Sequence, residues 1–92
     1  MTALYRLYTE DKPNLTDIVS AWFTGASLFM VTGLYAGVTE RGAVIEILGT
    51  DSATDRACVH GLAREIIVTN QQTEVLILTH ASAGLTSERV TR

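Results

Sequence analysis

The fold of this chain is decided by residues 27–48, which read SLFMVTGLYAGVTERGAVIEIL. The stretch predicts two strands joined by a tight turn at Glu40-Arg41-Gly42. In the second strand, Val44 and Leu48 share one face and Ile45 and Ile47 share the other, because strand side chains alternate. A strand that is apolar on both faces needs a cover on each side. Helices can supply one cover, and in so short a chain we expect a partner chain to supply the other.

The elements follow the order strand, helix, strand, strand, helix, strand. With right-handed crossovers, this order predicts a ferredoxin-like α+β domain, a four-stranded antiparallel sheet with both helices on one face. Residues 1–92 form a single domain, in which residues 81–92 are a tail or a short edge strand. The expected strands are Ala3–Thr9, Ser27–Thr39, Ala43–Leu48 and Thr73–Thr79, with helices capped by Asn14 and Ser52 between them.

Each predicted helix carries an apolar stripe. Gly25 is the expected stop of the first helix, and Asn70-Gln71-Gln72 ends the second. The spacing predicts that Trp22 lies in the core, so that truncating it to alanine would cost about 3–5 kcal/mol. The stripe of the first helix consists of Leu15, Ile18, Val19, Trp22 and Phe23, and that of the second consists of Ala57, Cys58, Leu62, Ala63, Ile66 and Ile67.

Composition excludes several classes of function. The chain has 92 residues, a formal net charge of -3 and seven basic residues without any basic run, so nucleic-acid binding is unlikely. The lone Cys58 forms neither an internal disulfide nor a cysteine zinc site, and it suits a cytoplasmic protein. His60 and His80 lack metal-ligand spacing, so no metal or other cofactor is expected. The N-terminal residues do not resemble a signal peptide, and no apolar run is long enough to span a membrane.

The residues that suggest chemistry gather around residues 33–46. Glycines 33 and 37 flank Tyr35, while Glu40 and Glu46 sit among apolar neighbours. A carboxylate in such surroundings can act as a general base or hold a cationic ligand. In the plainer interpretation, Glu46 pairs with Arg6 or Arg41 across the sheet, and Tyr35 packs at an interface.

Three motifs carry a resemblance to known proteins: Tyr8-Thr9-Glu10-Asp11-Lys12, Thr32-Gly33-Leu34-Tyr35-Ala36-Gly37 followed by Glu40, and Val44-Ile45-Glu46-Ile47. The whole chain resembles the small trimeric ferredoxin-like group of the PII signalling proteins and CutA, and more specifically short, uncharacterised bacterial and phage proteins. This resemblance implies a homotrimer that binds a small ligand, such as a nucleotide or S-adenosylmethionine, in clefts between subunits. The ligand-binding residues expected from it are Tyr8, Gly33, Tyr35, Gly37 and Arg41.

The chain is also similar to the phage S-adenosylmethionine lyases. Gly33-Leu34-Tyr35, Glu40 and the late segment Ala83-Gly84-Leu85 carry this second resemblance. It implies an intramolecular displacement at the sulfonium carbon, with Tyr35 and either Glu40 or Glu46 as catalytic residues in a site between subunits. The site would desolvate and position the substrate.

Three functions therefore stand open at this level: a PII-like oligomeric module that binds a small ligand, an S-adenosylmethionine lyase, and a phage-encoded inhibitor that binds a host protein complex. Small size, net acidity and the lack of a catalytic motif favour the third function. The sequence does not decide whether the protein is an enzyme.

Overall fold

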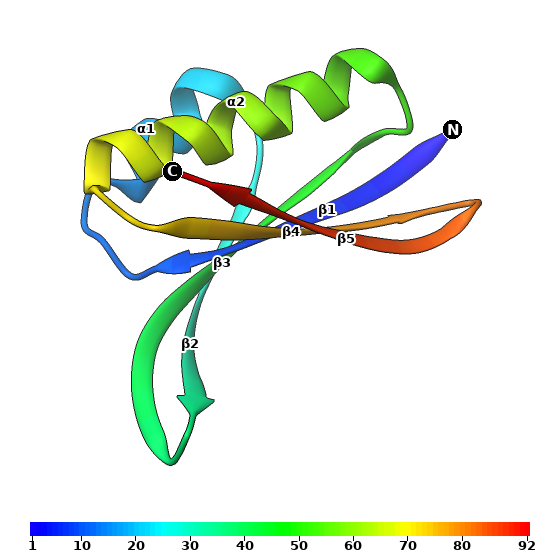
Figure 1. Ribbon diagram of the computed structural model, residues 1–92. Helices are drawn as coiled ribbons and strands as arrows, with labels where there is room; N and C mark the ends of the chain where they lie inside the picture. Colours follow the sequence, from blue (N-terminus) through cyan, green and yellow to red (C-terminus); the bar gives the residue numbers. More distant parts are fainter.

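A computed structural model describes residues 1–92, apart from the side chain of Tyr35. The chain forms a five-stranded antiparallel sheet of order β2-β3-β1-β4-β5, and both helices lie on one face of it (Figure 1). The elements are β1 Thr2–Glu10, α1 Leu15–Trp22, β2 Ser27–Tyr35, β3 Val38–Thr50, α2 Ala53–Asn70, β4 Glu74–Ala81 and β5 Gly84–Thr91.

The sheet has five strands and not the predicted four, because residues 84–91 form the edge strand that was one of the two alternatives for the C-terminal segment. β4 runs on to Ala81 and turns back through a two-residue loop, where Gly84 adopts a φ of 120° that favours glycine. β5 then pairs with β4 from Gly84 to Thr91. Only Val90 of β5 is buried, so the strand offered little apolar alternation from which to predict it.

The turn of the central hairpin lies at Ala36-Gly37, so the turn predicted at Glu40-Arg41-Gly42 was wrong. Tyr35 pairs with Val38, and the two residues between them have φ values of 52° and 80°. Positive φ at both central residues is the geometry that matches the twist of a two-residue hairpin. As a result β2 ends at Tyr35, and β3 takes in residues 38–42 as well as the segment that was predicted.

The core lies between the sheet and the helices. Alternate residues of β1, β3 and β4 face the helices, and α2 presents a stripe spaced i, i+3, i+4, i+7, i+8. The largest fully buried side chains are Tyr5, Leu7, Leu15, Ile45, Ile47, Leu62, Ile66, Ile67, Val59 and Val75.

The stripe of α2 begins two residues later than predicted, at Val59 and not at Ala57. Val59 is buried, whereas Cys58 is only half-buried and Ala57 is exposed. Trp22 was likewise wrongly placed in the core, since it is 37% exposed at the end of α1. Its ring lies beside Gly61 of α2, and its Nε1 donates to Glu65 Oε1 at 3.3 Å.

The helix ends confirm one predicted cap and correct the other. Ser52 Oγ accepts a hydrogen bond from the Asp55 amide at 3.1 Å, as its position before α2 predicts. Asn14 precedes α1 but makes no side-chain cap bond; its Nδ2 donates instead to Asn70 Oδ1 at 2.7 Å. Gly25 is not the stop, because the helix ends at Trp22 and Phe23 is already extended.

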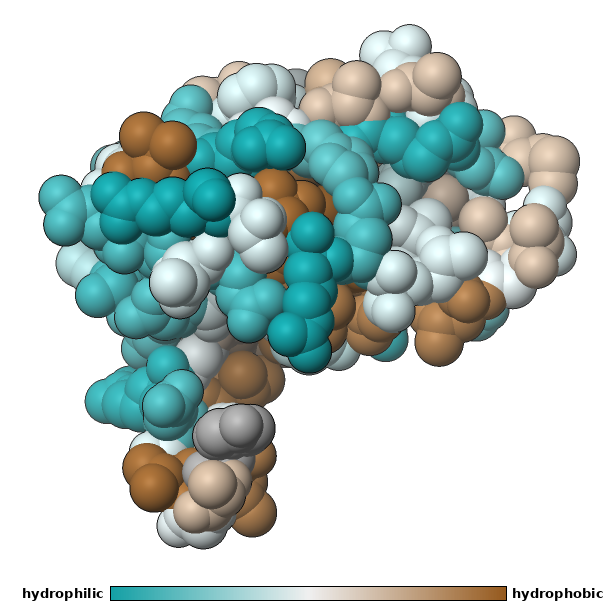
Figure 2. Space-filling model, viewed as in Figure 1, coloured by the Kyte–Doolittle hydropathy of each residue, from teal (hydrophilic) through white to brown (hydrophobic). Residues whose placement is uncertain are grey.

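The outer part of the β2–β3 hairpin projects from the body of the molecule. β1 pairs with β3 only as far as Gly42, so residues 32–41 extend beyond the sheet as a two-stranded arm (Figure 1). Leu34 and Val38 are exposed on the arm, and its tip is apolar in Figure 2. In the part of the chain that the structure describes, neither helix has the length and apolar character needed to cross a membrane.

Candidate functional site

One face of the sheet carries no helix, and we call it the open face. Residues directly opposite in antiparallel pairs point to the same side, so the pairing register identifies its members. The open face comprises Phe29 and Val31 of β2, Val44, Glu46 and Leu48 of β3, Leu4, Arg6 and Tyr8 of β1, Leu76, Leu78 and His80 of β4, and Leu85, Ser87 and Arg89 of β5. A surface this rich in leucine, valine and aromatic residues is typical of an interaction site.

An ion pair lies at the centre of the open face. Arg6 and Glu46 are cross-strand partners, and Arg6 Nε donates to Glu46 Oε2 at 2.8 Å. This hydrogen bond raises the pKa of Arg6 above its usual value. The Glu46 side chain is 29% exposed and lies between Val44 and Leu48 on its strand. The predicted pairing of Glu46 with Arg6 is therefore confirmed, and the carboxylate belongs to the open face.

A groove of about 350 Å³ lies where the arm leaves the sheet, and we call it the arm groove. Its lining includes four residues singled out from the sequence: Tyr8, Gly33, Glu40 and Arg41. The register brings them together, because Gly33 pairs with Glu40 and Tyr8 pairs with Val44, close to the base of the arm.

Three further residues singled out from the sequence lie elsewhere. Gly37 forms the tip of the arm, and Glu46 lies beside Leu48 at a separate hollow near Ser27. Tyr35 ends β2, and its side chain lies outside the described part of the chain.

The polar lining of the arm groove includes the carboxylates of Glu10, Glu40 and Glu74 as well as Arg41 and Gln72. Arg41 is largely exposed and lies 3.6 Å from the Asp11 carboxylate, so it is available to an anionic group. Gln72 is buried, and its Oε1 accepts a hydrogen bond from Thr9 Oγ1 at 2.8 Å. From the sequence, Gln72 was predicted only to end the second helix. Nothing in the sequence indicates that a polar residue between a helix and a strand will be buried.

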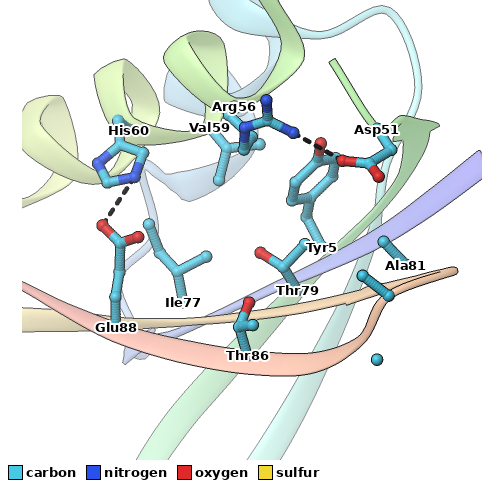
Figure 3. Close-up of a pocket in the computed structure, with 12 residues that line it drawn as sticks. Tyr5, Asp51, Arg56, Val59, His60, Ile77, Thr79, Ala81, Thr86 and Glu88 are labelled. Atoms are coloured by element: carbon cyan, nitrogen blue, oxygen red, sulfur yellow. Dashed lines mark hydrogen bonds and ion pairs between the residues drawn. The ribbon is translucent and has the colours of Figure 1, made fainter. Parts of the chain in front are cut away.

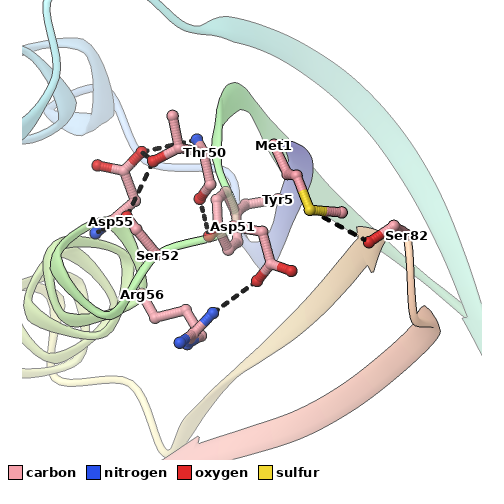
Figure 4. Close-up of polar contacts among 8 residues, drawn as sticks. All are labelled: Met1, Tyr5, Thr50, Asp51, Ser52, Asp55, Arg56 and Ser82. Atoms are coloured by element: carbon pink, nitrogen blue, oxygen red, sulfur yellow. Dashed lines mark hydrogen bonds and ion pairs between the residues drawn. The ribbon is translucent and has the colours of Figure 1, made fainter.

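The junction between β3 and α2 forms a second polar centre (Figure 4). Asp55 Oδ2 accepts from the Thr50 amide and from Thr50 Oγ1, each at 2.7 Å, and these two bonds lower the pKa of Asp55. The Tyr5 hydroxyl donates to the Thr50 carbonyl at 2.6 Å. Burial, followed by the nearby Asp55 charge, raises the pKa of Tyr5. The lowered pKa of Asp55 stabilises the junction at neutral pH, whereas the raised pKa of Tyr5 keeps its hydroxyl protonated as a donor.

A separate cavity of about 180 Å³ lies between α2 and the β4–β5 hairpin (Figure 3). Tyr5 forms part of its floor, and Arg56 and His60 of α2 line its wall. This cavity was not predicted from the sequence, in which residues 81–92 were left as a tail or a short edge strand and His60 was considered only as a metal ligand. Among the residues that the structure describes, no three His, Cys, Asp or Glu side chains converge as metal ligands do.

Comparison with known proteins gives a likeness in fold. No family model matches the chain, and no curated protein matches it. A phage SAM lyase in complex with S-methyl-5'-thioadenosine superposes with a TM-score of 0.77 at 19% identity, over 99% of this chain and 90% of that one. A phage SAM lyase in the apo state gives 0.75 and 21%, over 98% and 89%. At such identities the likeness shows the fold alone. It favours the predicted resemblance to the lyases and gives no support to the PII and CutA resemblance.

Proposed function

We propose that this protein is an S-adenosylmethionine lyase whose site forms between copies of the chain. The observation that carries the proposal is the shared fold: nearly the whole chain superposes on a phage SAM lyase, and that structure holds S-methyl-5'-thioadenosine. This molecule is what remains of S-adenosylmethionine once its amino-acid chain has left. We propose that the reaction takes place among the candidate residues on the open face and in the arm groove.

The reaction needs no water and no proton. One carboxylate oxygen of the substrate attacks its own γ-carbon, and a C–O bond forms as the C–S bond breaks. The electron pair of the broken bond passes to sulfur, which loses its positive charge. The products are homoserine lactone and S-methyl-5'-thioadenosine. Because the nucleophile and the leaving group belong to one molecule, folding the substrate into the reactive conformation is a large part of catalysis.

The charges in this reaction dictate what the site must provide. A negative carboxylate and a positive sulfonium neutralise each other, so the transition state is less polar than the bound substrate. Apolar surroundings that exclude water therefore favour the reaction. The leucines and valines of the open face provide such surroundings once a second copy covers them.

The polar candidates hold and orient the charged groups of the substrate's amino-acid part. The substrate ammonium group suits a carboxylate, either Glu40 in the arm groove or Glu46 on the open face. Arg41 suits the substrate carboxylate and orients it for attack. We add Tyr35 to these residues because the resemblance to the lyases implies that it is catalytic. Glu40 and Arg41 line the arm groove, whereas Glu46 lies at another hollow of the same chain, and for that reason we propose that the arm of one copy meets the open face of the next in a trimer.

Turnover of S-adenosylmethionine by the purified protein tests the proposal. We expect mass spectrometry to detect S-methyl-5'-thioadenosine together with homoserine lactone. In water enriched in oxygen-18, the lactone should form without the heavy isotope, whereas hydrolysis would place it in homoserine. If the protein binds S-adenosylmethionine without turning it over, it is a binding module; if it neither binds nor turns over this substrate, the proposal fails.

Glu46→Gln tests the role of the open-face carboxylate. The amide keeps an oxygen for Arg6 but loses the charge, so we expect kcat/KM to fall by about tenfold or more, the ratio that roughly 1.4 kcal/mol produces. Glu65→Gln on α2 is the matched control and should keep full activity, since Glu65 lies against Trp22. Light scattering on each variant separates loss of chemistry from loss of assembly. Unchanged kcat/KM in Glu46→Gln would remove Glu46 from the site.

A further inference from the structure

The cavity under α2 lies where the side chains of the β4–β5 hairpin become small toward its turn. Four cross-strand pairs face α2 in succession: Val75 with Val90, Ile77 with Glu88, Thr79 with Thr86, and Ala81 with Gly84. The first pair is fully packed, at 0% and 4% exposure. The last two pairs are small, and the space between them and Arg56 and His60 of α2 stays open. Gly84 and Thr86 are exposed, so the cavity opens to solvent and a ligand can enter it.

The walls of the cavity combine an apolar floor with paired charges at the rim (Figure 3). Tyr5, Val59 and Ile77 form the floor, and all three are buried. At the rim, Arg56 Nη1 lies 2.6 Å from Asp51 Oδ1, and His60 Nε2 lies 2.7 Å from Glu88 Oε1.

The cavity is separate from the proposed lyase site. It borders Tyr5 and the turn after β4, whereas the arm groove lies at the opposite end of β1, beside Glu10. The open face is on the other side of the sheet. An occupant of this cavity would therefore add to the proposed function and does not depend on it.

We propose that this cavity binds a free α-amino acid with an aliphatic side chain. In the bound state the ligand carboxylate forms an ion pair with Arg56 and the ligand ammonium forms one with Asp51. The aliphatic chain packs on Ile77 and Val59. The hydroxyls of Thr79 and Thr86 on the hairpin side offer further hydrogen bonds.

The ion pair at the rim explains why a zwitterion fits. A ligand with a single charge would take one member of the Arg56–Asp51 pair and leave the other without a partner, which is unfavourable in a partly enclosed site. A zwitterion inserts between them and gives each a new partner of opposite sign. Both side chains are partly exposed, at 50% and 28%, so they are free to separate.

The size of the cavity limits the ligand. Its volume of about 180 Å³ is below the roughly 300–1,000 Å³ of pockets that take drug-sized molecules. A nucleotide is too large for it, whereas a single amino acid is of the right scale. The buried apolar floor selects an aliphatic side chain over a polar one.

Methyl NMR on the full chain tests the proposal with three probes of the same branched carbon skeleton. L-leucine carries both charges, 4-methylpentanoate only the carboxylate, and 3-methylbutylamine only the ammonium. We expect leucine to shift the methyl signals of Ile77 and Val59 and to bind at least about tenfold more tightly than either single-charge probe. Titration should extend to about 10 mM, ten times the roughly 1 mM Kd of a weak site. The absence of any leucine-dependent shift at that concentration would overturn the proposal, and so would equal binding of 4-methylpentanoate or 3-methylbutylamine.

Two variants separate the cavity from the rest of the surface. Thr86→Ile fills the cavity and should abolish the leucine-dependent shifts, while Thr69→Ile, on the exposed side of α2, should leave them unchanged. If Thr86→Ile fails to fold, Arg56→Gln on the rim replaces it. That variant should weaken leucine about tenfold and should not weaken 3-methylbutylamine, because Asp51 no longer has to give up Arg56. Leucine binding that survives both cavity variants would overturn the assignment.

Discussion

At the scale of single residues, Asp55 shows how a side chain can belong to both a strand and a helix. It caps the end of β3 by accepting two hydrogen bonds from Thr50, while its own amide donates to Ser52 at the start of α2. Gly49 makes room for this arrangement, because a Cβ there would lie 2.9 Å from Asp55 Oδ2. The connection between sheet and helix therefore depends on the charged form of one carboxylate.

This dependence predicts how stability varies with acid. Hydrogen bonds from Thr50 lower the pKa of Asp55 in the folded protein, so its contribution is present above the unfolded value near 4 and is lost as pH falls through the folded value. We expect urea unfolding of the Asp55→Asn variant to depend less on pH below about 4 than that of the wild type. Asp17→Asn, in the first turn of α1, is the matched control and should keep the wild-type acid dependence. Identical acid profiles for Asp55→Asn and the wild type would contradict this role.

At the scale of elements, the contact between α1 and α2 depends on a large residue of α1, Trp22, that packs against a glycine of α2, Gly61. The Trp22 ring occupies the space that a side chain at position 61 would take, because a Cβ on Gly61 would overlap it. Glycine in the middle of a helix costs roughly 0.5–1 kcal/mol relative to alanine. That cost is offset by the apolar area that Trp22 covers on α2. Being partly exposed, Trp22 should stabilise the fold less than the roughly 3–5 kcal/mol of a fully buried aromatic.

A double-mutant cycle measures this arrangement. Gly61→Ala in the Trp22→Ala background should stabilise the protein by roughly 0.5–1 kcal/mol through helix propensity. In the wild type the same change forces the ring away and should lose that gain. The coupling free energy from chemical unfolding should therefore be about 1 kcal/mol or more. Additive effects would mean that the ring does not rest on Gly61.

The elements also show where sequence patterns succeed. Periodicity located both helices and β1, because their apolar residues recur at one period over several turns or pleats. It left β5 undecided between a tail and a short edge strand, because seven of its eight residues are exposed and Leu85 and Val90 are its only large apolar residues. It also placed the hairpin turn at the charged Glu40-Arg41-Gly42, whereas the twist of the strands selects Ala36-Gly37.

The candidate site could be predicted only where strand pairing follows from the fold. The ion pair of Glu46 with Arg6 was one of the two pairings that we predicted across the sheet. The arm groove collects four predicted residues because β3 pairs with both β1, which carries Tyr8, and β2, which carries Gly33. The cavity under α2 was out of reach, since it depends on small residues of β4 and β5 lying opposite one another.

At the scale of the whole molecule, apolar surface is distributed unevenly. The helix side of the sheet is packed, whereas the open face and the arm expose large apolar residues such as Phe29, Leu34 and Leu48. Monomeric proteins rarely leave contiguous patches of this kind in water. Assembly of several copies through the open face would cover these apolar residues. It would also exclude water from the Arg6–Glu46 ion pair.

Two exposed apolar residues allow a matched test of assembly. Leu48 on the open face is 74% exposed, and Val68 on α2 is 70% exposed. Arginine at either position is equally tolerable to a single chain. We expect light scattering to show that Leu48→Arg dissociates the assembly while Val68→Arg does not. A wild-type mass equal to one chain at all concentrations would contradict self-association and, with it, a lyase site between copies.

The strand β3 runs without interruption from the tip of the arm, through the sheet, to the cap of α2. The face of the sheet to which each residue of β3 points is therefore fixed along the whole strand. A single residue inserted into the strand would turn every later side chain to the opposite face. The ion pair of Glu46 and the burial of Ile45 and Ile47 would be lost together. A lengthened arm must add one residue to each of its strands, so we expect natural variants of this chain to differ by even numbers of residues between Ser27 and Glu46.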